Sequence, residues 1–565
     1  MNLFIQIINS FKSKNLTTNQ LLFLTCCYIT LIINLPFLLK AGYAITSLAD
    51  YNVLFLLSLP LFLLSLTLIF QSLFAFRWIT KPLLILVVIC SSLLFYATVT
   101  YGIIFDYGMI QNTVETDSAE VFSYINIYAI FFFIVFGFLP SLYIYGVQLS
   151  YKSFFYELLS RLKLISLAVV ATVIIGCFFY SNYAAVGRNN KELISYIIPY
   201  KMVDSSVKFI RNQYIYPPLK FKLLDTAPSI ERDNHRKHVT VLVLGETARA
   251  QSFSLNGYEK PTNQFTQQQN VVSFSNVSSC GTATAVSVPC MFSRLNKADY
   301  NKRIATSQQN VVDLIHLAGA DVLWISNNNG SCKGVCTRVK SQQISTDKDN
   351  PLCDGEYCYD EALLQPLQIK LENLTSENTL IVLHMMGSHG PTYFKRYPEN
   401  KGVFIPDCRR SDIQNCTHEQ LVNTYDNTIA YTDYVLSQVV KKLGQLSDES
   451  NIESSLLYIS DHGESLGESG VYLHGLPYSF APKEQTHVPM IFWTDPMQTD
   501  FNLACLSQSK DINISHDNIF DTLLSIMSIK TKSYHIENDP FKYCKSQSAI
   551  VRTTIKTELE MEISD

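Results

Sequence analysis

The chain has 565 residues, of which 48% are hydrophobic and 16% are charged, and its formal net charge is −4. This balance excludes the strongly basic surface that nucleic-acid binding requires, so we expect no nucleic-acid partner. The length allows more than one domain. Residues 1–181 are largely apolar with few charges, whereas the residues from about 235 onward have the composition of an ordinary soluble domain.

Five long apolar segments lie in the first third of the chain. Each is long enough to cross the hydrocarbon core of a bilayer, which is about 30 Å thick and needs about 20 helical residues. A buried core helix or a cleaved signal peptide would explain one such segment but not five in succession, and no small-residue cleavage site follows any of them. We therefore predict five transmembrane helices, at residues 20–39, 52–76, 82–105, 124–146 and 163–181.

Basic residues are distributed unevenly among the connections between these segments. One set of connections carries Lys12, Lys14, Arg77, Lys81, Lys152, Arg161 and Lys163. The other set carries Lys40 and the acidic residues Asp106, Glu115, Asp117 and Glu120. Because basic loops stay in the cytoplasm, we predict a cytoplasmic amino terminus. An odd number of crossings then places everything after residue 181 on the opposite side of the membrane.

The cysteines give an independent indication of the compartment. Of fourteen, four lie in apolar segments, and the other ten all lie in the soluble part, mostly as close pairs. Close pairs also occur in zinc sites, but disulfides persist outside the cytoplasm, where the topology places this part. We predict the pairs Cys280–Cys290, Cys332–Cys336, Cys353–Cys358 and Cys408–Cys416, and by elimination Cys505–Cys544.

Residues 182–235 form a connector between the two parts. Its segment 199–214 mixes apolar and basic residues, as an interfacial helix does, although a linker helix packed on the soluble domain fits equally well. Pro217 and Pro218 then interrupt any helix. We place a transmembrane domain at 1–181, the connector at 182–235 and a soluble domain at 236–565.

From residue 238 short apolar runs alternate with amphipathic stretches. Several runs are apolar throughout, as strands buried on both faces of a sheet are. The clearest helix covers 418–446, and Thr417 with Gln420 forms a capping box at its start. Alternating strands and helices predict an α/β domain with a mainly parallel central sheet. The predicted strands are 239–245, 321–326, 379–385, 455–461 and 488–494.

Acidic residues and histidines follow three of these strands. Glu246 follows the first, His389 the third, and Asp461 and His462 the fourth, with His474 a little later. Ligands bind beyond the carboxyl ends of strands in such sheets. Carboxylate and imidazole groups are zinc ligands, and zinc lowers the pKa of a bound hydroxyl. Hydrolysis by a serine-histidine-aspartate triad is the competing mechanism, but no G-x-S-x-G turn follows any of these strands.

A candidate nucleophile lies in the stretch SCGTATAVSVPC, residues 279–290. Two cysteines bracket three hydroxyl side chains, Thr282, Thr284 and Ser287, with no charge among them. Any of the three could become a nucleophile beside a metal. The spacing leaves them as equal candidates.

Several long motifs resemble a known family. They are VLVLGETARA (241–250), SCGTATAVSVPCMFS (279–293), SHGPTYFKRYP (388–398), YDNTIAYTD (425–433), YISDHGESLGE (458–468) and YLHGLPYSFAPKEQTHVP (472–489). They resemble the lipid A phosphoethanolamine transferases, which include the mobile colistin-resistance enzymes and belong to the alkaline phosphatase and sulfatase superfamily. The resemblance covers essentially the whole chain. It implies five transmembrane helices in the bacterial inner membrane and a periplasmic catalytic domain of the alkaline phosphatase and sulfatase type.

The resemblance also implies residue roles. Thr284 becomes the nucleophile, and His389 and His474 act on the substrate phosphate or hold an additional zinc ion. Lys333 matches a substrate-pocket lysine, although Cys332 directly before it departs from some family members. The implied zinc ligands are Glu246, Thr284, Asp461 and His462. The implied substrate-binding residues are Asn112, Thr116, Glu120, Asn329, Lys333, His389 and His474.

The implied reaction transfers phosphoethanolamine from phosphatidylethanolamine to a phosphate of lipid A through a covalent phospho-threonine, and it confers resistance to polymyxin. We expect a monomer that uses one or more zinc ions. Transfer to inner-core sugars of lipopolysaccharide is the closest alternative. The disulfide-rich domain and the C-G-T-A-T context argue against a lipoteichoic-acid-type glycerol-phosphate transferase. A third possibility is a non-enzymatic membrane sensor with a degenerate hydrolase domain. Such a domain would lack some of the metal ligands, whereas every expected type of metal ligand is present in the sequence.

Overall fold

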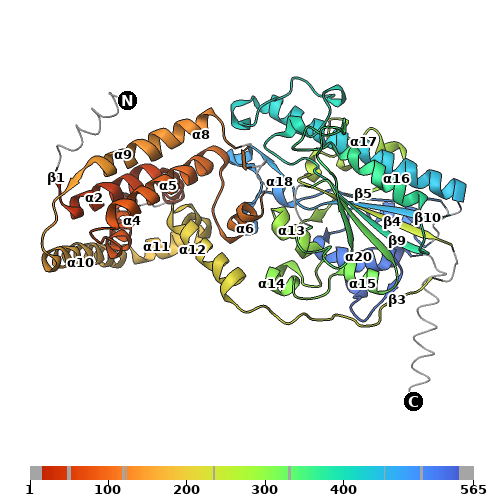
Figure 1. The fold of residues 1–565 in the computed structure, drawn as a ribbon, viewed down its shortest axis with the longest axis horizontal. Helices are drawn as coiled ribbons and strands as arrows, with labels where there is room; N and C mark the ends of the chain where they lie inside the picture. The colour runs from red at the N-terminus through yellow and green to blue at the C-terminus, as the bar shows by residue number, and fades with distance from the viewer. Residues whose placement is uncertain are drawn as a thin grey trace, which may run out of the picture. The chain divides into compact units, whose positions relative to one another are not determined.

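The computed structural model describes residues 15–47, 52–116, 121–122, 124–232, 236–328, 332–450, 452–496 and 500–545. The chain forms two compact units (Figure 1). The first comprises Met1–Ile110 and Ile125–Ile210, and the second comprises Gln111–Tyr124 and Arg211–Asp565. A short segment from the apolar third of the sequence thus belongs to the soluble unit.

The first unit contains the long apolar helices. Four spans are long and apolar enough to cross a membrane: α4 (Val53–Leu73), α5 (Thr80–Tyr101), Ile127–Gly146 and α10 (Phe154–Phe178). The third of these combines α8 (Ile127–Phe132), a π-helical segment and α9 (Leu139–Gly146). A fifth span exists if α2 (Thr18–Tyr28), its continuation to Ile33 and α3 (Leu35–Thr46) are counted together. The predicted five helices therefore correspond to four single spans and one bent pair.

The bend of 60° in this pair has a local cause. Pro36 lies in the first turn of α3 and has no backbone N–H to donate to the preceding helix. Asn34 stands at the break, where its side-chain amide donates to Ile29 O at 2.9 Å. The backbone N–H of Asn34 donates to the same oxygen at 2.9 Å, so two donors of Asn34 close the end of the first helix.

The last span differs from its predicted bounds. It begins at Phe154 rather than residue 163, so Arg161 and Lys163 lie in the helix and not in a loop. Arg161 pairs with Glu157 one turn earlier at 2.9 Å, which offsets its charge. After α11 (Tyr180–Asn189), helix α12 (Tyr200–Ile210) occupies much of the predicted connector helix.

The second unit is built on a seven-stranded sheet with the order β5-β13-β10-β4-β9-β7-β8. The five strands from β10 to β8 are parallel, and β13 is antiparallel to its neighbours β10 and β5. This arrangement confirms the predicted mainly parallel sheet. The strands are β4 (His238–Gly245), β5 (Val272–Phe274), β7 (Asp321–Ser326), β8 (Lys340–Gln343), β9 (Asn378–His384), β10 (Glu453–Ser460) and β13 (Met490–Thr494).

Helices cover both faces of this sheet (Figure 1). One face carries α15 (Val311–Leu317) and α20 (Ile519–Ile526), and the other carries α16 (Leu364–Glu372) and α17 (His418–Ser450). Both β4 and β10 are buried along their whole length, which explains their apolar runs. The predicted capping box is present, since Thr417 Oγ1 accepts from Gln420 N at 3.2 Å and Gln420 Oε1 accepts from Thr417 N at 3.0 Å.

Five disulfides join cysteines of the second unit. They are the five pairs predicted from the sequence: Cys280–Cys290, Cys332–Cys336, Cys353–Cys358, Cys408–Cys416 and Cys505–Cys544. The cysteines of the apolar segments, Cys26, Cys27, Cys90 and Cys177, are free thiols.

Candidate active site

Two neighbouring strand ends bring an acidic cluster together. Gly245 at the end of β4 lies opposite Ser460 at the end of β10. Glu246 directly follows the first strand, and Asp461 and His462 follow the second. All three side chains are fully buried, and one ligand atom of each lies within 4.8 Å of the others. The parallel register therefore explains how residues more than 200 positions apart form one cluster.

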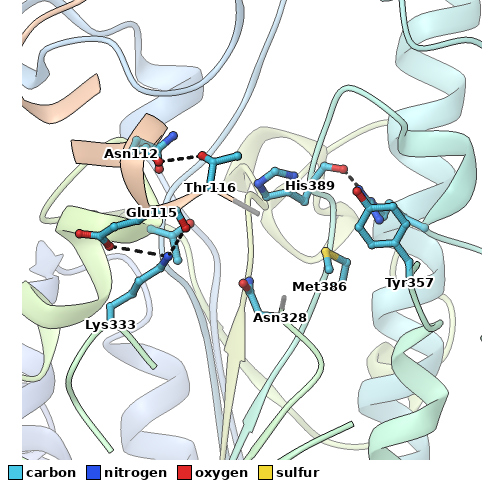
Figure 2. A pocket seen from close by; sticks show the side chains of 10 residues that line it. Asn112, Glu115, Thr116, Asn328, Lys333, Tyr357, Met386 and His389 are labelled. Atoms are coloured by element: carbon cyan, nitrogen blue, oxygen red, sulfur yellow. Dashed lines mark hydrogen bonds and ion pairs between the residues drawn. The ribbon is translucent and has the colours of Figure 1, made fainter. Parts of the chain in front are cut away.

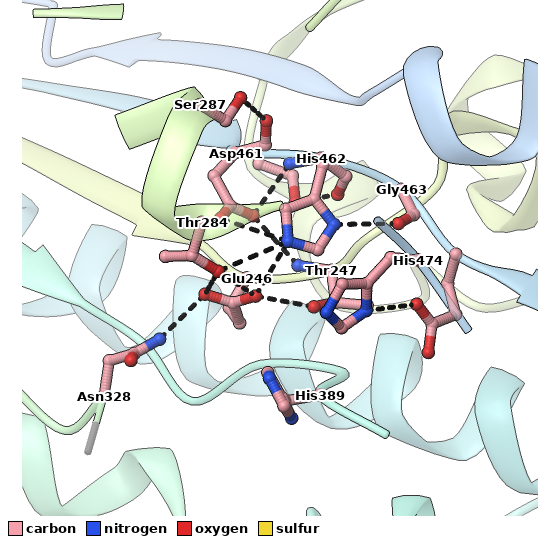
Figure 3. Close-up of polar contacts among 12 residues, drawn as sticks. Glu246, Thr247, Thr284, Ser287, Asn328, His389, Asp461, His462, Gly463 and His474 are labelled. Carbon is pink, nitrogen blue, oxygen red and sulfur yellow. Dashed lines mark hydrogen bonds and ion pairs between the residues drawn. The ribbon is translucent and has the colours of Figure 1, made fainter. Parts of the chain in front are cut away.

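Of the three candidate hydroxyls, the structure brings Thr284 to this cluster (Figure 3). Thr284 begins helix α13 (Thr284–Met291), and its hydroxyl donates to the two Glu246 oxygens at 3.0 and 3.1 Å. It also lies 3.3 Å from His462 Nε2. The Thr282 hydroxyl instead donates to Leu476 O at 2.6 Å, and that of Ser287 donates to Asp461 O.

The electrostatics of the cluster favour a bound cation. Burial, with the charge of Glu246, raises the pKa of Asp461 to about 7. Burial also disfavours an imidazolium, yet the Asp461 and Glu246 carboxylates outweigh it and raise the pKa of His462 to about 10. Asp461 Oδ2 is buried without a hydrogen-bond partner among the described residues. The His462 Nε2 atom lies 3.4 Å from it, so a bound cation would supply the direct contact that this buried oxygen lacks.

The donor set fits zinc. Two carboxylates and one imidazole are protein ligands of catalytic zinc sites, and the hydroxyl lies where the fourth, open position would be. A second group of potential ligands consists of Cys280, Cys290 and Asp517. Those two cysteines form a disulfide and are not thiolate ligands. Among the described residues, the cluster of Glu246, Asp461 and His462 is therefore the one that fits a metal.

Both predicted additional histidines lie beside the cluster (Figure 3). The His474 ring centre is 4.5 Å from that of His462 and 5.3 Å from that of His389. His474 Nδ1 lies 2.8 Å from Glu464 Oε2, and burial lowers the pKa of His474 to about 3. Burial raises the pKa of Glu464 to about 8. This arrangement holds a neutral imidazole at the site.

A pocket opens at this edge of the sheet (Figure 2). The predicted residues Asn112, Thr116, Lys333, His389 and Thr284 all line it. Glu120 and Asn329, also predicted to bind substrate, lie outside the described residues. The other lining residues are Glu115, Asn328, Tyr357, Met386 and Arg396, none of which the sequence analysis assigned to the site.

Comparisons with known proteins identify the family. The sulfatase family model matches residues 238–529, and the model described as phosphoethanolamine transferase EptA/EptB matches residues 62–214. Phosphoethanolamine transferase EptA of Escherichia coli K12 is 38% identical over 546 residues, which are 95% of this chain and 99% of the relative. The chain belongs to the phosphoethanolamine transferase family.

Two further members of the phosphoethanolamine transferase family agree. Phosphatidylethanolamine transferase Mcr-1 of Escherichia coli is 37% identical, covering 89% of this chain and 93% of the relative. The structure is similar to that of the integral membrane lipooligosaccharide phosphoethanolamine transferase A of Neisseria meningitidis. That match has a TM-score of 0.90 and 32% identity, and it covers 94% of this chain and 99% of the other.

Two further pocket residues of this phosphoethanolamine transferase, Asn328 and Glu115, occupy sequence positions that could have indicated a role in the site. Asn328 lies just beyond β7, where the strand-end rule applies, and its amide donates to Glu246 Oε2 at 2.8 Å. Glu115 directly precedes Thr116 and forms ion pairs with Lys302 and Lys333, the latter at 3.7 Å. Tyr357, Met386 and Arg396 carried no local signal for a ligand site.

The segment that carries Asn112 and Thr116 is attached close to Thr284. Gln111 is buried, and its amide donates to Ala285 O at 2.7 Å. Lys333 lies between Cys332 and Cys336 and adopts a φ of 51°, an uncommon conformation for a non-glycine residue. Lys333 nevertheless lines the pocket, so the cysteine before it does not displace this lysine from the site.

Proposed function

We propose that this protein transfers phosphoethanolamine from phosphatidylethanolamine to a phosphate group of lipid A, with Thr284 as the covalent nucleophile. The contact of the Thr284 hydroxyl with Glu246 and His462 carries the proposal, because it distinguishes one of three candidate hydroxyls and supports a role beside the proposed metal ligands. Membership in the family supports phosphoethanolamine transfer. The relatives' names support a lipid donor and a lipopolysaccharide-type acceptor.

Zinc would be held by Glu246, Asp461, His462 and Thr284, and when bound it would lower the pKa of the hydroxyl and offset phosphoryl charge. In the first step Thr284 Oγ1 forms a bond to the donor phosphorus, and the bond from phosphorus to the diacylglycerol oxygen breaks. The hydroxyl proton leaves Thr284, and the diacylglycerol oxygen gains a proton. In the second step an oxygen of the acceptor phosphate attacks, the Thr284–phosphorus bond breaks, and Thr284 regains its proton.

His389 and His474 are the proposed groups for these proton transfers. The contact between His474 Nδ1 and Glu464 orients the ring and leaves Nε2 as the nitrogen for proton exchange. His389 Nδ1 similarly lies 2.8 Å from Gly390 O. Glu464 thus holds one nitrogen of His474 and leaves the other for the substrate oxygens, while the Gly390 carbonyl orients the His389 ring.

The pocket offers groups suited to the donor headgroup. The Lys333 ammonium would offset charge on the phosphoryl oxygens. Asn112 and Thr116 lie on the same wall, and the Thr116 hydroxyl donates to Asn112 O at 2.7 Å. We propose that they contact the ethanolamine end, together with Glu120, and that Asn329 contributes to the same pocket.

The proposed location follows from the substrates. The apolar spans place the protein in a membrane, where both lipids reside. We propose the bacterial inner membrane, with the soluble unit in the periplasm, where its disulfides persist. An ethanolamine cation added to lipid A phosphate lowers the negative surface charge, so polymyxin and other cationic peptides would bind less.

Mass spectrometry of lipopolysaccharide tests this function. Cells that express the protein should contain lipid A carrying one added phosphoethanolamine, and cells that express Thr284→Val should not. The fragment that carries the added group separates lipid A from the inner-core sugars. Addition to the core alone would overturn the proposed acceptor, and addition by the Thr284→Val protein would overturn the nucleophile.

A further inference from the structure

Arg396 is a buried arginine of the pocket wall with an unusual electrostatic environment. Among the described residues three arginines are buried: Arg161, Arg249 and Arg396, the last with 4% of its surface exposed. Arg161 and Arg249 each form an ion pair, with Glu157 at 2.9 Å and with Glu468 at 2.6 Å. No ion pair joins Arg396 to a carboxylate of the described chain. A buried charge without a counterion is costly, so a ligand that supplies negative charge is expected.

Neutral contacts hold the guanidinium in place. Nε donates to His389 O at 2.8 Å, and an Nη2 hydrogen is donated to Thr392 Oγ1 at 3.2 Å. The guanidinium carbon lies 4.3 Å from the centre of the Tyr357 ring. Nη1 is buried and has no hydrogen-bond partner among the described residues. The side chain is thus oriented, yet part of its donor capacity is unused.

The positive charge of Arg396 acts on two nearby carboxylates, Asp360 and Asp354, and each of them has closer contacts with other groups. Asp360 accepts from the backbone N–H groups of Met386 and Gly387 and from the Asn327 amide, each at 2.8 Å. Asp354 lies 3.8 Å from the Lys395 ammonium. Each interacts electrostatically with Arg396, but neither forms an ion pair with it, so among the described residues Arg396 lacks a directly paired anion.

The two walls of the pocket differ in chemistry (Figure 2). Glu115 and Lys333 on one wall present a carboxylate and an ammonium, which suit a zwitterionic phosphoethanolamine headgroup. Tyr357 lies on the opposite side with Arg396 4.3 Å from its ring centre, and Glu115 is the one carboxylate among the described lining residues. That wall suits a phosphate that carries no ammonium group of its own.

We propose that Arg396 binds the acceptor, through the dianionic phosphomonoester of a sugar phosphate, in the second half of the reaction. The proposal deepens the proposed function and rests on it. A shift of the buried guanidinium toward the pocket would let a phosphate oxygen accept the unused Nη1–H, and this charge-assisted hydrogen bond would favour a phosphate acceptor over a neutral sugar hydroxyl. Arg396 would thus contribute to the choice of lipid A over the inner-core sugars.

The test separates the two half-reactions of the full-length protein in detergent. Without acceptor, Arg396→Gln should slow diacylglycerol release from phosphatidylethanolamine only modestly, because it removes the Nε bond to His389 O but leaves Lys333 in the pocket. With lipid A added, kcat/KM for the acceptor should fall by about tenfold or more, as the loss of a charged hydrogen bond predicts. Arg396→Lys should restore part of this loss because it keeps the positive charge. An equal loss in both half-reactions would overturn the proposal.

Arg294→Gln is the matched control. Arg294 also lies over an aromatic ring, 4.6 Å from the centre of Phe520, but it pairs with Asp521 at 2.7 Å. This variant should lower thermal stability and leave the KM for lipid A unchanged. If Arg294→Gln lowers kcat/KM for lipid A as much as Arg396→Gln does, both effects come from lost stability and the inference fails.

A binding measurement keeps the inference independent of turnover. Lipid A should bind to the Thr284→Ala protein about tenfold more tightly than to the Thr284→Ala, Arg396→Gln protein in thermophoresis. Equal affinities would overturn the role of Arg396. If wild type transfers nothing to lipid A, the proposed function fails, and the binding comparison still decides whether Arg396 recognises the phosphate.

Discussion

Thr282 and Thr284 offer an internal comparison, because both are buried to the same extent and differ in what their hydroxyls contact. Each has 7% of its surface exposed. The Thr284 hydroxyl contacts the Glu246 carboxylate, whereas that of Thr282 donates to Leu476 O. Valine replaces either hydroxyl with a methyl group. The pair Thr284→Val and Thr282→Val therefore separates loss of a nucleophile from loss of a structural hydrogen bond.

These contacts determine how much stability and how much covalent adduct each variant should lose. Thr282→Val leaves the Leu476 carbonyl without its side-chain donor, which costs about 1–3 kcal/mol of stability. The backbone bond from Gly475 N to Thr282 O, at 2.8 Å, remains and keeps the neighbouring His474 segment attached. Thr284→Val removes the oxygen that would receive the phosphoryl group, so its covalent adduct should fall to zero. Thr284→Ser keeps that oxygen and should still form the adduct.

Intact-protein mass spectrometry after incubation with phosphatidylethanolamine, without acceptor, measures the adduct, and thermal denaturation measures the stability loss. We expect the phosphoethanolamine mass on wild type, Thr282→Val and Thr284→Ser, with the Thr282→Val protein melting at a lower temperature. An adduct on Thr284→Val, or one mapped by peptide fragmentation to Thr282 or Ser287 of wild type, would refute the assignment.

Three further changes test the surroundings of the nucleophile. Asp461→Asn should lower the zinc content per chain, measured by elemental mass spectrometry, because it replaces a buried anionic ligand with a neutral amide; unchanged zinc would exclude Asp461 as a ligand. Gly387→Ala should abolish transfer while circular dichroism stays native, since φ is +54° and a Cβ would lie 2.5 Å from Glu246 O; normal activity would contradict this close approach. Replacing Cys280 and Cys290 with serine should remove about 2–4 kcal/mol of stabilisation and speed amide hydrogen exchange in residues 281–290; unchanged exchange would show that the disulfide does not restrain the loop.

The sheet could be predicted from the sequence because its central strands are buried on both faces. The runs around β4, β9 and β10 are apolar almost throughout, so their burial is visible in the residues themselves. The edge strands β5 and β8 were missed. β5 has three residues, and all four residues of β8 are polar and exposed, so neither has a periodic apolar pattern.

The buried cluster of Glu246, Asp461 and His462 was predictable because its members directly follow strands. Glu246 and Asp461 need only the order of adjacent parallel strands to meet. Arg396 and Tyr357 come from irregular stretches with no periodicity, and their meeting depends on long-range contacts that no local pattern specifies. The bend at Asn34 was also missed, since mean hydropathy does not register a single proline.

The membership of Gln111–Tyr124 in the soluble unit has a practical consequence for inhibitor discovery. A soluble fragment that begins near Arg211 would keep Thr284 and the buried acidic cluster but lack Asn112, Glu115 and Thr116. Compounds selected against that fragment would meet a pocket with one wall missing. Ligands that depend on this wall would go undetected, and some that fill its place would clash in the complete enzyme. Screening therefore calls for the full-length chain, or for a fragment to which residues 111–116 have been grafted.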